Sequence, residues 1–402
     1  MSSPLKGLTN PAWKPGLPAV AQTLVDKAAL DEVFRYHQSF PQYSPTPLRR
    51  LSALASSWGV ADVFVKDESY RFGLNAFKVL GASYAVGKIL AGRLGKSLDD
   101  LPFAALKDPS VKAALAGLTF AATTDGNHGR GVAWTAAQLG FPATIFMPKG
   151  TVAARLENIR KLGQSAEVTA WNYDDTVRWV ADQARQKGWE MVQDTAWDGY
   201  VDVPRWIMQG YSTVARETLE QLQGVRPTHV FLQAGVGAFA AIIAALILDY
   251  YTAAPGPLPK ILVLEAQPAE CFYESIRLGK KTAVTGDLDT IMAGLACGEP
   301  NPLSWDILKE CGFAFLAAPN EAAAHGMRVL GNPLAGDERI VSGESGAVGP
   351  GVLGWLMSRP EYTGLKADLG LGPDSRVLCF STEGDTDPAM YRKVVWEGAF
   401  HG

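Results

Sequence analysis

Residues 119–147 read TFAATTDGNHGRGVAWTAAQLGFPATIFM, and this stretch predicts the fold. A β-rich run from Thr119 to Thr124 leads into a glycine-rich turn. From Gly131 to Leu139 the apolar residues recur at three- and four-residue intervals, as on one face of a helix, and a second β-rich run follows from Ala143 to Met147. Strand, helix and strand in this order are typical of a parallel sheet, because parallel neighbours need a crossover connection.

The same alternation continues along the chain. Further β-rich runs lie at 63–65, 167–169, 190–193, 229–232, 261–264 and 377–380. Amphipathic stretches lie between several of them, at 151–162, 174–187 and 207–222. The sequence therefore predicts an α/β protein with parallel-rich sheets flanked by helices.

Two α/β domains are expected from the distribution of these runs. Residues 81–194 hold four of the strand candidates with their helices, which is enough for one compact unit. The strands after Pro227 make another unit, to which the early strand at 63–65 has to return. We therefore predict a small α/β domain, residues 81–194, inserted into a large domain formed by residues 1–80 and 195–402.

The composition indicates a globular protein with a small-molecule partner. The 402 residues are 47% hydrophobic and 19% charged, which excludes disordered and fibrous classes. The net charge is −4 and both signs are interspersed, which argues against a nucleic-acid-binding surface. No apolar leader is visible, and the longest apolar run, Ala238 to Leu248, is too short to span a bilayer. We expect a cytoplasmic protein without a membrane segment.

The four cysteines carry no metal-binding signature. Cys271, Cys297, Cys311 and Cys379 lack CxxC spacing, so neither a metal site nor a disulfide framework is implied. Buried thiols are the simplest interpretation. Pairing of Cys271 with Cys297 depends on whether the fold brings the two together.

Lys78 is the first candidate for chemistry. It ends the segment Asn75-Ala76-Phe77-Lys78, precedes an apolar helix-forming run, and has no acidic residue within six positions on either side. A lysine in such surroundings can lose its hydration, and an amine in that state can form a Schiff base with an aldehyde. Because a lysine at a helix start is more often a surface group, this hypothesis depends on a site for an aldehyde cofactor elsewhere in the chain.

A glycine-rich turn, Thr124-Asp125-Gly126-Asn127-His128-Gly129, runs from the strand of the opening stretch into its helix. Glycines let the backbone approach a ligand closely, and the N–H groups at the start of the helix suit a carboxylate such as that of an amino acid. The amide of Asn127 could donate to a phenolic oxygen, whereas His128 is either a ligand contact or a structural partner. An ordinary βα turn is the alternative, but it does not explain the acidic Asp125 at a site that attracts anions.

A second glycine cluster, Gly235-Val236-Gly237-Ala238, lies between the strand at 229–232 and a long apolar helix. Its backbone N–H groups suit a phosphate. The cluster also satisfies a dinucleotide fingerprint, because Gly235-x-Gly237-x-x-Ala240 is followed by a strand that ends in Glu265. A nicotinamide-dependent dehydrogenase is therefore an alternative, although it leaves Lys78 and the Asp125 turn without a task.

Polar residues follow several other strand candidates. Asp194 and Glu344 are carboxylates of this kind, and each could equally cap a helix or face water. Ser381 and Thr382 follow the last strand candidate, at the end where open α/β sheets bind ligands.

Together these motifs resemble the fold-type II pyridoxal phosphate enzymes, which include serine and threonine dehydratases and serine racemase. Within that group, segments at 71–78, 124–131, 193–211, 290–300 and 382–388 are similar to the diaminopropionate ammonia-lyases. The resemblance covers most of the chain, from about Tyr43 to Lys393. Dehydratases usually carry a small residue where Asp125 stands, and a richer glycine loop than Gly235-Val236-Gly237-Ala238. Asp125 is thus the feature that distinguishes an ammonia-lyase from a dehydratase of the same fold.

The resemblance implies a role for each motif. Lys78 would bind pyridoxal 5′-phosphate as a Schiff base, with Phe77 and Glu344 beside the cofactor. The cofactor's phosphate would contact the loop Gly235, Val236, Gly237 and Ala238. Its ring hydroxyl would contact the amide of Asn127. Its pyridine nitrogen would contact Thr382 or, less favoured, Ser381. Thr124, Asp125, Gly126, His128 and Asp194 would bind the substrate. No metal is required, and family members suggest a homodimer.

The implied reaction is the α,β-elimination of 2,3-diaminopropionate to pyruvate and two molecules of ammonia. The substrate differs from serine in its β-ammonium group, for which Asp125 and Asp194 supply negative charge. Lys78 would exchange the α-proton on one face of the substrate and Asp125 on the other, which would admit both the D and the L enantiomer. A serine or threonine dehydratase or a serine racemase is the main alternative; a dehydrogenase or a non-catalytic binding module is more distant.

Overall fold

Two sheets organise the chain, which is described here from a computed structural model for residues 4–124 and 126–401. Contacts divide the chain into two compact units. The first comprises Met1–Thr23, Pro45–Tyr70 and Val214–Gly402, and the second comprises Leu24–Ser44 and Arg71–Thr213. Each unit contains one of the two sheets.

The predicted inserted domain, residues 81–194, lies within the second unit. That unit also takes in an early segment, Leu24–Ser44, together with residues 71–80 and 195–213. The domain boundaries at residues 80 and 194 therefore stay a prediction, whereas the α/β class with parallel-rich sheets is confirmed.

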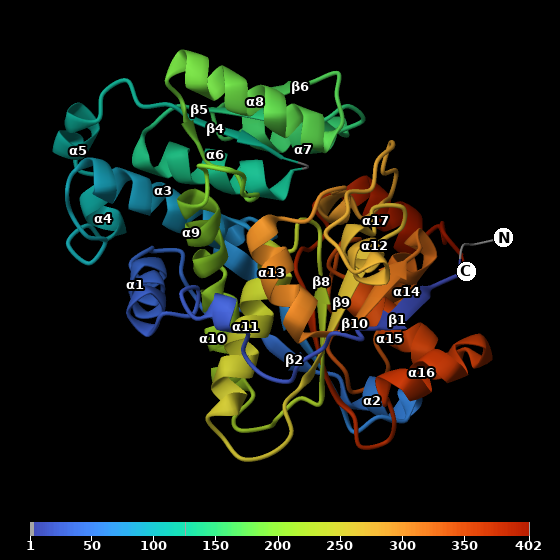
Figure 1. Ribbon diagram of the computed structural model, residues 1–402. Coiled ribbons are helices and arrows are strands. Elements are labelled where there is room, and N and C mark those ends of the chain that lie inside the picture. Colours follow the sequence, from blue (N-terminus) through green and yellow to red (C-terminus); the bar gives the residue numbers. More distant parts are fainter. Residues whose placement is uncertain (1–3, 125, 402) are drawn as a thin grey trace. The chain divides into compact units, whose positions relative to one another are not determined.

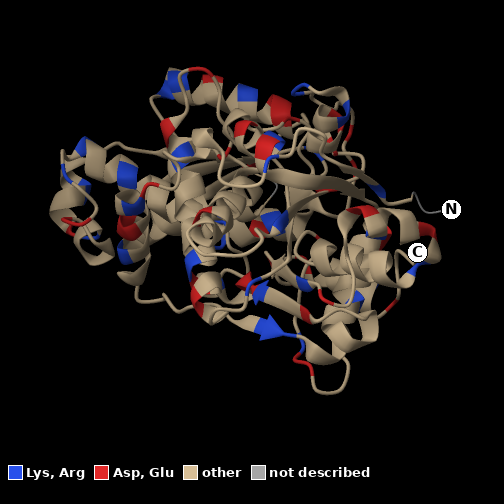
Figure 2. Ribbon diagram, turned by 60° about the horizontal axis from the view of Figure 1, so that its bottom comes forward, with Lys and Arg blue, Asp and Glu red and all other residues tan. Residues whose placement is uncertain are grey.

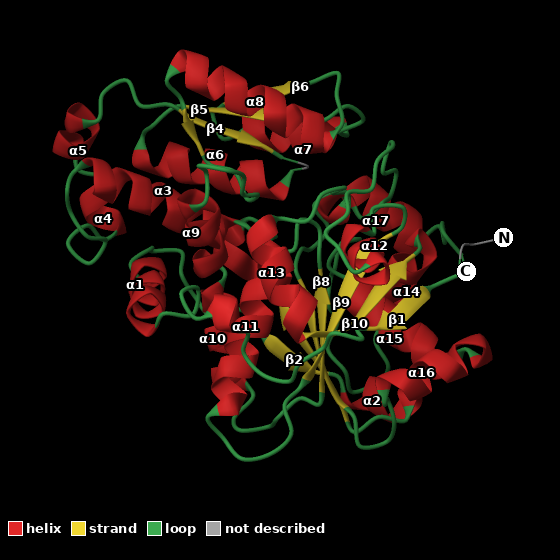
Figure 3. Cartoon of the chain, in the orientation of Figure 1, coloured by secondary structure: helices red, strands yellow, loops and turns green. Residues whose placement is uncertain are grey.

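The first unit holds a seven-stranded sheet in the order β1-β10-β9-β8-β11-β3-β2. The strands are β1 (Lys6–Thr9), β2 (Leu48–Arg50), β3 (Asp62–Asp67), β8 (His229–Gln233), β9 (Lys260–Ala266), β10 (Gly312–Ala318) and β11 (Arg376–Ser381). The five central strands pair in parallel, and the two edge strands β1 and β2 pair antiparallel with their neighbours. The strands appear as neighbouring yellow arrows in Figure 3.

Helices surround this sheet (Figure 1). They are α2 (Ser52–Trp58), α11 (Ala238–Thr252), α12 (Cys271–Leu278), α13 (Pro302–Cys311), α14 (Asn320–Gly331), α15 (Val348–Ser358), α16 (Thr363–Leu369) and α17 (Pro388–Val395), with short 3₁₀ turns at Ala19–Ala21, Ala293–Leu295 and Pro360–Tyr362. A 3₁₀ segment, Glu68–Gly73, and α10 (Ser212–Gln221) each contain a point where the chain passes from one unit to the other.

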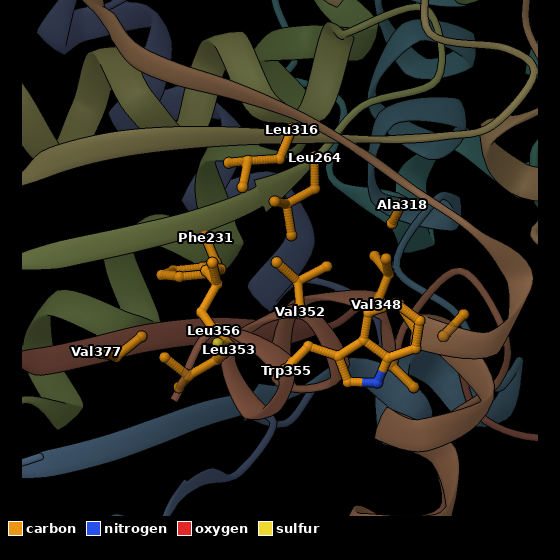
Figure 4. Packing of buried hydrophobic residues seen from close by; sticks show 14 of the residues in the cluster. Phe231, Leu264, Leu316, Ala318, Val348, Val352, Leu353, Trp355, Leu356 and Val377 are labelled. Atoms are coloured by element: carbon orange, nitrogen blue, oxygen red, sulfur yellow. The ribbon is translucent and has the colours of Figure 1, made fainter. Parts of the chain in front are cut away.

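Strand alternation assigns the two faces of the sheet to different helices, because successive side chains point to opposite faces. On β11, Val377 belongs to a buried cluster with Phe231 of β8 and with Val352 of α15, which Figure 4 shows from close by. Phe380, three residues further along β11, points to the other face and contacts Phe239 of α11, with ring centroids 5.5 Å apart. Helix α11 therefore covers the face opposite to α15, and its first turn lies at the C-terminal end of β8.

The second unit holds a four-stranded parallel sheet in the order β6-β5-β4-β7. Its strands are β4 (Phe120–Thr123), β5 (Ala143–Met147), β6 (Ser165–Val168) and β7 (Glu190–Met191). Its helices are α1 (Lys27–Gln38), α3 (Val79–Arg93), α4 (Phe103–Leu106), α5 (Pro109–Ala114), α6 (Asn127–Leu139), α7 (Ala153–Arg160), α8 (Tyr173–Lys187) and α9 (Asp202–Gly210). Figure 1 shows α6 and α8 on opposite faces of this sheet.

Glycines bring α3 close to two other helices. A Cβ atom at Gly81 of α3 would lie 2.7 Å from the carbonyl oxygen of Ile207 in α9. A Cβ atom at Gly131 of α6 would lie 2.9 Å from the Cα of Val79 in α3. Since real Cβ atoms do not approach backbone so closely, side chains at these positions would push α3 away from both helices. The start of α3, where Lys78 lies, is thereby held against α6.

Charged residues of both signs are interspersed along the chain, as Figure 2 shows, which agrees with the pattern in the sequence. The apolar run from Ala238 to Leu248 lies in α11 and is almost entirely buried. Among the described residues, none of the helices combines the length and the apolar character that a membrane crossing requires. All four cysteine side chains are buried, and the pairing of Cys271 with Cys297 stays open.

Candidate active site

The backbone before Lys78 adopts an unusual conformation. Phe72 and Asn75 have positive φ angles of 49° and 59°, which non-glycine residues rarely adopt. The guanidinium of Arg130 in α6 donates a hydrogen bond of 2.9 Å to the carbonyl oxygen of Leu74, between these two residues. Such backbone strain persists only where the surroundings fix it, and it clusters at functional sites. The loop therefore delivers Lys78 to a defined position at the start of α3.

Lys78 lies beside Asp194, which follows β7. Its Nζ is 3.4 Å from the Asp194 Oδ2, and the two side chains are 16% and 3% exposed. The other carboxylate oxygen, Oδ1, accepts hydrogen bonds from the Tyr173 hydroxyl at 3.0 Å and from the Gln193 Nε2 at 3.2 Å. One oxygen of Asp194 is thus fixed by neutral donors, while the other faces a cation.

These contacts act on the pKa of Asp194. Burial of the carboxyl favours its neutral form, but the charges of Lys78 and His128 and the hydrogen bond from Tyr173 together outweigh burial and hold the pKa of Asp194 below its usual range. Asp194 is therefore a carboxylate near neutral pH. No acidic residue lies within six positions of Lys78 in the sequence, and it is the fold that brings Asp194 next to it.

Gln193 connects Asp194 to the rest of the second unit. Its side-chain nitrogen also donates to the Tyr173 hydroxyl at 2.8 Å, and its side-chain oxygen accepts from the backbone N–H of Thr123 at the end of β4. Its backbone N–H donates to the hydroxyl of Tyr200 at 2.9 Å. The carboxylate of Asp194 thus sits in a network that ties three separate segments together.

The glycine-rich turn before α6 is organised by Thr124. Its hydroxyl oxygen accepts hydrogen bonds from the backbone N–H groups of Gly126, at 2.8 Å, and Gly129, at 2.9 Å. Gly129 has to be a glycine, since a Cβ there would lie 2.4 Å from the Thr124 side chain. Gly126 has a φ of 149° and precedes the helix. Asp125 falls outside the described residues.

This arrangement changes how an anion could bind at the start of α6. Thr124 already occupies the N–H groups of Gly126 and Gly129, so the first amides of the helix, rather than the glycine amides, are the donors suited to a carboxylate. The helix itself begins at Asn127, four residues before the predicted start at Gly131.

His128 makes a structural contact. Its Nε2 lies 2.7 Å from the carbonyl oxygen of Val192, two residues before Asp194. Because a carbonyl only accepts, this nitrogen carries the proton of the hydrogen bond. Two residues of α6 therefore hold the candidate catalytic residues in place. Arg130 contacts the loop before Lys78, and His128 contacts the segment before Asp194.

The second glycine cluster lies in the first unit, at the start of α11. A Cβ at Gly235 would be 2.8 Å from the carbonyl oxygen of Gly294, and Gly237 has a φ of 88°. Both positions require glycine, which leaves the backbone bare where the N-terminus of α11 offers its amides. The residues fit a bound phosphate group. Gly294, in the segment at 290–300, packs against this glycine cluster, which we call the glycine cradle (Gly235 to Ala238). The sequence did not predict this contact.

Glu265, the acidic residue of the dinucleotide fingerprint, has a different task. Its two carboxylate oxygens accept hydrogen bonds of 2.7 Å from the backbone N–H groups of Phe272 and Tyr273, in the first turn of α12. Burial raises the pKa of Glu265 to about 8, although these two hydrogen bonds oppose the shift. The side chain is thus buried against a helix start, where it cannot read a ribose.

Ser381 and Thr382 differ in their partners. The Ser381 hydroxyl donates to the hydroxyl of Ser342 at 2.8 Å. The Thr382 hydroxyl oxygen accepts from the side-chain nitrogen of Gln233 at 3.1 Å. Ser381 is thus paired within the protein as a donor, which favours Thr382 as the residue that donates to a ligand.

Glu344 is 2% exposed and lies in the segment that precedes α15. The next residue, Ser345, donates its backbone N–H to the Glu383 side chain at 3.0 Å, and its hydroxyl accepts from the N–H of Gly294 at 3.1 Å. This segment therefore packs beside both the turn after Thr382 and Gly294 next to the glycine cradle. A contact between Glu344 and a cofactor stays a prediction.

Comparison with known proteins places these clusters in a family. The sequence profile of pyridoxal-phosphate dependent enzymes matches residues 40–380. The chain belongs to this family. Members use pyridoxal phosphate, which is the kind of aldehyde cofactor that the Lys78 hypothesis required, and the nicotinamide alternative is wrong. The assignment of Lys78 itself stays a prediction.

Individual relatives narrow the family further. The chain is 52% identical over 366 residues to the diaminopropionate ammonia-lyase of Escherichia coli, with 90% of each chain covered. A crystal structure of that enzyme in complex with D-serine superposes with a TM-score of 0.91, at 46% identity over 99% of this chain and 98% of the other. The biosynthetic L-threonine dehydratase of Haemophilus influenzae is 26% identical over 240 residues, which are 60% of this chain and 39% of that one.

Proposed function

We propose that this chain catalyses the α,β-elimination of 2,3-diaminopropionate, as both the D and the L enantiomer, to pyruvate and two molecules of ammonia. The observation that carries the proposal is the 52% identity to a diaminopropionate ammonia-lyase along 90% of both chains. The buried Asp194 carboxylate beside Lys78 supports it, because a dehydratase substrate carries no cation at its β-carbon whereas diaminopropionate does.

Pyridoxal 5′-phosphate, when bound, withdraws electrons from the α-carbon of the amino acid. Lys78 supplies the amine that binds the cofactor's aldehyde, and Gly235, Val236, Gly237 and Ala238 supply backbone donors for its phosphate. Phe77, Asn127 and Glu344 are the further residues assigned to the cofactor, with the Asn127 amide directed at the ring hydroxyl. This assignment is supported by the glycine cradle and by the strained loop that positions Lys78.

Thr382 is the residue assigned to the pyridine nitrogen. A neutral hydroxyl stabilises a protonated pyridinium less well than a carboxylate would. The assignment therefore favours prompt elimination over transamination. It is supported by the hydrogen bond that the hydroxyl of Ser381, the alternative residue, already donates to Ser342.

The substrate's β-ammonium group calls for negative charge, which Asp125 and Asp194 supply. Asp194 already directs its Oδ2 at a cation, the ammonium of Lys78. Once the Lys78 nitrogen is used for the cofactor, the β-ammonium of the substrate can take over this carboxylate oxygen. Tyr173 and Gln193 hold the other oxygen and so keep the carboxylate oriented during the exchange.

Proton transfer at the α-carbon is divided between two groups. The amine of Lys78, once released, removes the α-proton on one face of the substrate, and Asp125 does so on the other face. Thr124, Gly126 and His128 are assigned to the substrate. Because Thr124 occupies the N–H of Gly126, the first amides of α6 are the proposed donors to the substrate's carboxylate. The β-ammonium group already carries the proton it needs, so it leaves as ammonia with the electron pair of its carbon–nitrogen bond, and water then converts the resulting enamine to pyruvate and the second ammonia.

The decisive experiment measures pyruvate release from D- and L-diaminopropionate beside D- and L-serine and L-threonine. The proposal expects both enantiomers of diaminopropionate to give the highest kcat/KM values. A preference for L-serine or L-threonine over both of them would identify a dehydratase instead and overturn the proposal.

A homodimer in the cytoplasm completes the proposal. Family resemblance supports the dimer, and the location stays an expectation. Light scattering of the purified holoenzyme gives the mass directly, and a mass of one chain would contradict the dimer.

A further inference from the structure

Gln233 is a buried polar residue that the proposed reaction does not use. It is the last residue of β8, precedes the glycine cradle and is 3% exposed. Its side-chain nitrogen, Nε2, lies within hydrogen-bond distance of four oxygens. These are the backbone carbonyl oxygens of Phe380, Ser345 and Gly346, at 2.8, 3.1 and 3.4 Å, and the hydroxyl oxygen of Thr382, at 3.1 Å.

The orientation of this amide follows from its neighbours. Backbone carbonyls only accept hydrogen bonds, so three of the four oxygens require the nitrogen end of the amide to face them. A flipped amide would place its own oxygen against three carbonyl oxygens. The Oε1 end has no hydrogen-bond partner among the described residues, so nothing favours the flipped state.

The fixed amide also decides what the Thr382 hydroxyl can do. The hydroxyl oxygen faces an N–H donor, to which it cannot donate. Its own hydrogen must therefore point to another acceptor. In the site as proposed above, that acceptor is the pyridine nitrogen of the cofactor.

We propose that Gln233 is the positioning residue that makes Thr382 a hydrogen-bond donor to the cofactor's ring nitrogen and so keeps that nitrogen unprotonated. This inference rests on the proposed function, in which Thr382 faces the ring. Gln233 touches neither cofactor nor substrate in this scheme. It acts by occupying one of the two acceptor positions of the Thr382 oxygen and by orienting the hydroxyl so that its hydrogen is directed at the ring nitrogen, which opposes the arrangement in which the oxygen accepts a hydrogen bond from a pyridinium.

Two substitutions separate this role from simple packing. Gln233→Met keeps the length of the side chain and removes the donor. Gln233→Lys keeps a donor-only group in front of the three carbonyls and the hydroxyl. Thr382→Val, which removes the hydroxyl and keeps the shape, is the reference for complete loss of the hydrogen bond to the ring.

The test is the ¹⁵N NMR shift of the ring nitrogen in holoenzyme loaded with ¹⁵N-labelled pyridoxal phosphate, followed as a function of pH. The wild type should show an unprotonated, hydrogen-bonded nitrogen. Gln233→Met should move the signal most of the way to that of Thr382→Val, and Gln233→Met with Thr382→Val should move it no further. Gln233→Lys should keep the wild-type signal.

Three outcomes overturn the inference. One is a wild-type nitrogen signal in Gln233→Met while Thr382→Val shifts it. Another is a shifted signal in Gln233→Lys, which remains informative if Gln233→Met fails to fold. The third is an unchanged signal in Thr382→Val, which removes Thr382 as the ring partner. The proposed reaction would fail separately, in the pyruvate assay, so the two failures are distinguishable.

Discussion

Lys78 Nζ and Asp194 Oδ2 lie 3.4 Å apart, although 116 positions separate the two residues in the chain. This relationship gives the lysine a counter-ion in a nearly closed environment, where the surroundings screen charges poorly. In the proposed reaction it also presents the substrate's β-ammonium with a carboxylate that is already arranged for a cation. The same pair would therefore link the group proposed to bind the cofactor to the group proposed to recognise the substrate.

Replacement of Lys78 tests the first half of this link. Lys78→Ala should abolish the absorbance of the lysine-bound cofactor and the trapping of the cofactor by borohydride. Lys78→Arg should lose both signals too, because a guanidinium does not form the bond. The arginine, however, keeps a cation beside Asp194, so we expect Lys78→Arg to melt at a higher temperature than Lys78→Ala. Borohydride trapping that persisted in the alanine variant would disprove the assignment.

Replacement of Asp194 tests the second half. Asp194→Asn keeps the shape of the side chain and removes its charge. We expect kcat/KM for diaminopropionate to fall roughly 10- to 100-fold, since a charge-assisted hydrogen bond contributes about 1.5–3 kcal/mol, whereas kcat/KM for serine should change less. Asp198→Asn, at an exposed carboxylate four residues later, is the matched control and should change neither value. An unchanged ratio between the two substrates in Asp194→Asn would show that Asp194 does not read the β-ammonium group.

Asp125 is expected to distinguish the two enantiomers. If Lys78 and Asp125 serve opposite faces of the α-carbon, Asp125→Asn should reduce kcat for one enantiomer far more than for the other, and we expect the D isomer to be the more affected. General acid–base groups typically contribute about 10²- to 10⁴-fold, which sets the scale of the loss. Initial rates of pyruvate release from each pure enantiomer provide the measurement. Equal losses for both isomers would refute the division between two faces.

Much of this site follows from the sequence, because its motifs depend on local chemistry. The turn after Thr123 and the loop from Gly235 to Ala238 each combine a strand end, glycines and a helix start, and all three signals are visible within ten residues. Lys78 at the start of α3 is readable for the same reason. Strands β4 and β5 lie where alternation and apolar content predict them.

The remainder depends on contacts between distant segments, which no local pattern encodes. Tyr173 lies one residue before the predicted amphipathic stretch at 174–187, yet it is the first residue of α8 and its hydroxyl donates a hydrogen bond to Asp194. Gln193 and Gln233 adjoin recognised motifs, but an amide at a strand end carries no signal of its own. The early segment Leu24–Ser44 joins the second unit because α1 packs against α3 and α9. Composition alone does not predict this packing.

Three strands were also missed, each for a physical reason. β1 and β2 are short antiparallel edge strands of four and three residues, too brief for an alternation to register. β10 begins at Gly312, directly after the last residue of α13, so no turn signal separates the two elements. Its apolar run is buried on both faces and therefore lacks the period-two pattern of a half-exposed strand.

The glycine cradle can be tested through cofactor affinity. Gly235→Ala places a Cβ 2.8 Å from the Gly294 carbonyl oxygen, so one of the two segments has to move. Overpacking of this kind costs about 1–3 kcal/mol, and we expect the dissociation constant for pyridoxal phosphate to rise about 5- to 150-fold. Gly364→Ala is the matched control, because a Cβ in that turn of α16 meets nothing within 4 Å. Equal affinities for the cofactor in the two variants would argue against a phosphate at this loop.

Tyr173 offers a test of how Asp194 is kept charged. Tyr173→Phe removes one donor to the Asp194 Oδ1 and leaves the ring in place, so the pKa of Asp194 should rise from its lowered value while Lys78 and His128 still hold it down. A carboxylate with a lowered pKa contributes stability that is present above its unfolded-state pKa and is lost as the pH falls through its folded-state pKa. In Tyr173→Phe the folded-state pKa lies closer to the unfolded-state value, so this contribution to stability should be smaller and its loss should be complete at a higher pH than in the wild type.

The same substitution should alter the pH dependence of catalysis with the same sign. The acidic limb of kcat/KM for diaminopropionate should move to higher pH in Tyr173→Phe, because Asp194 has to be ionised to bind the β-ammonium. At alkaline pH the two enzymes should differ by no more than about 5-fold, the value of one hydrogen bond of about 1 kcal/mol. Tyr200→Phe is the control, since the Tyr200 hydroxyl contacts the backbone of Met191 and Gln193 but not the carboxylate. An acidic limb that moved in Tyr200→Phe and stayed in place in Tyr173→Phe would assign the control of Asp194 to the loop backbone and not to the phenol.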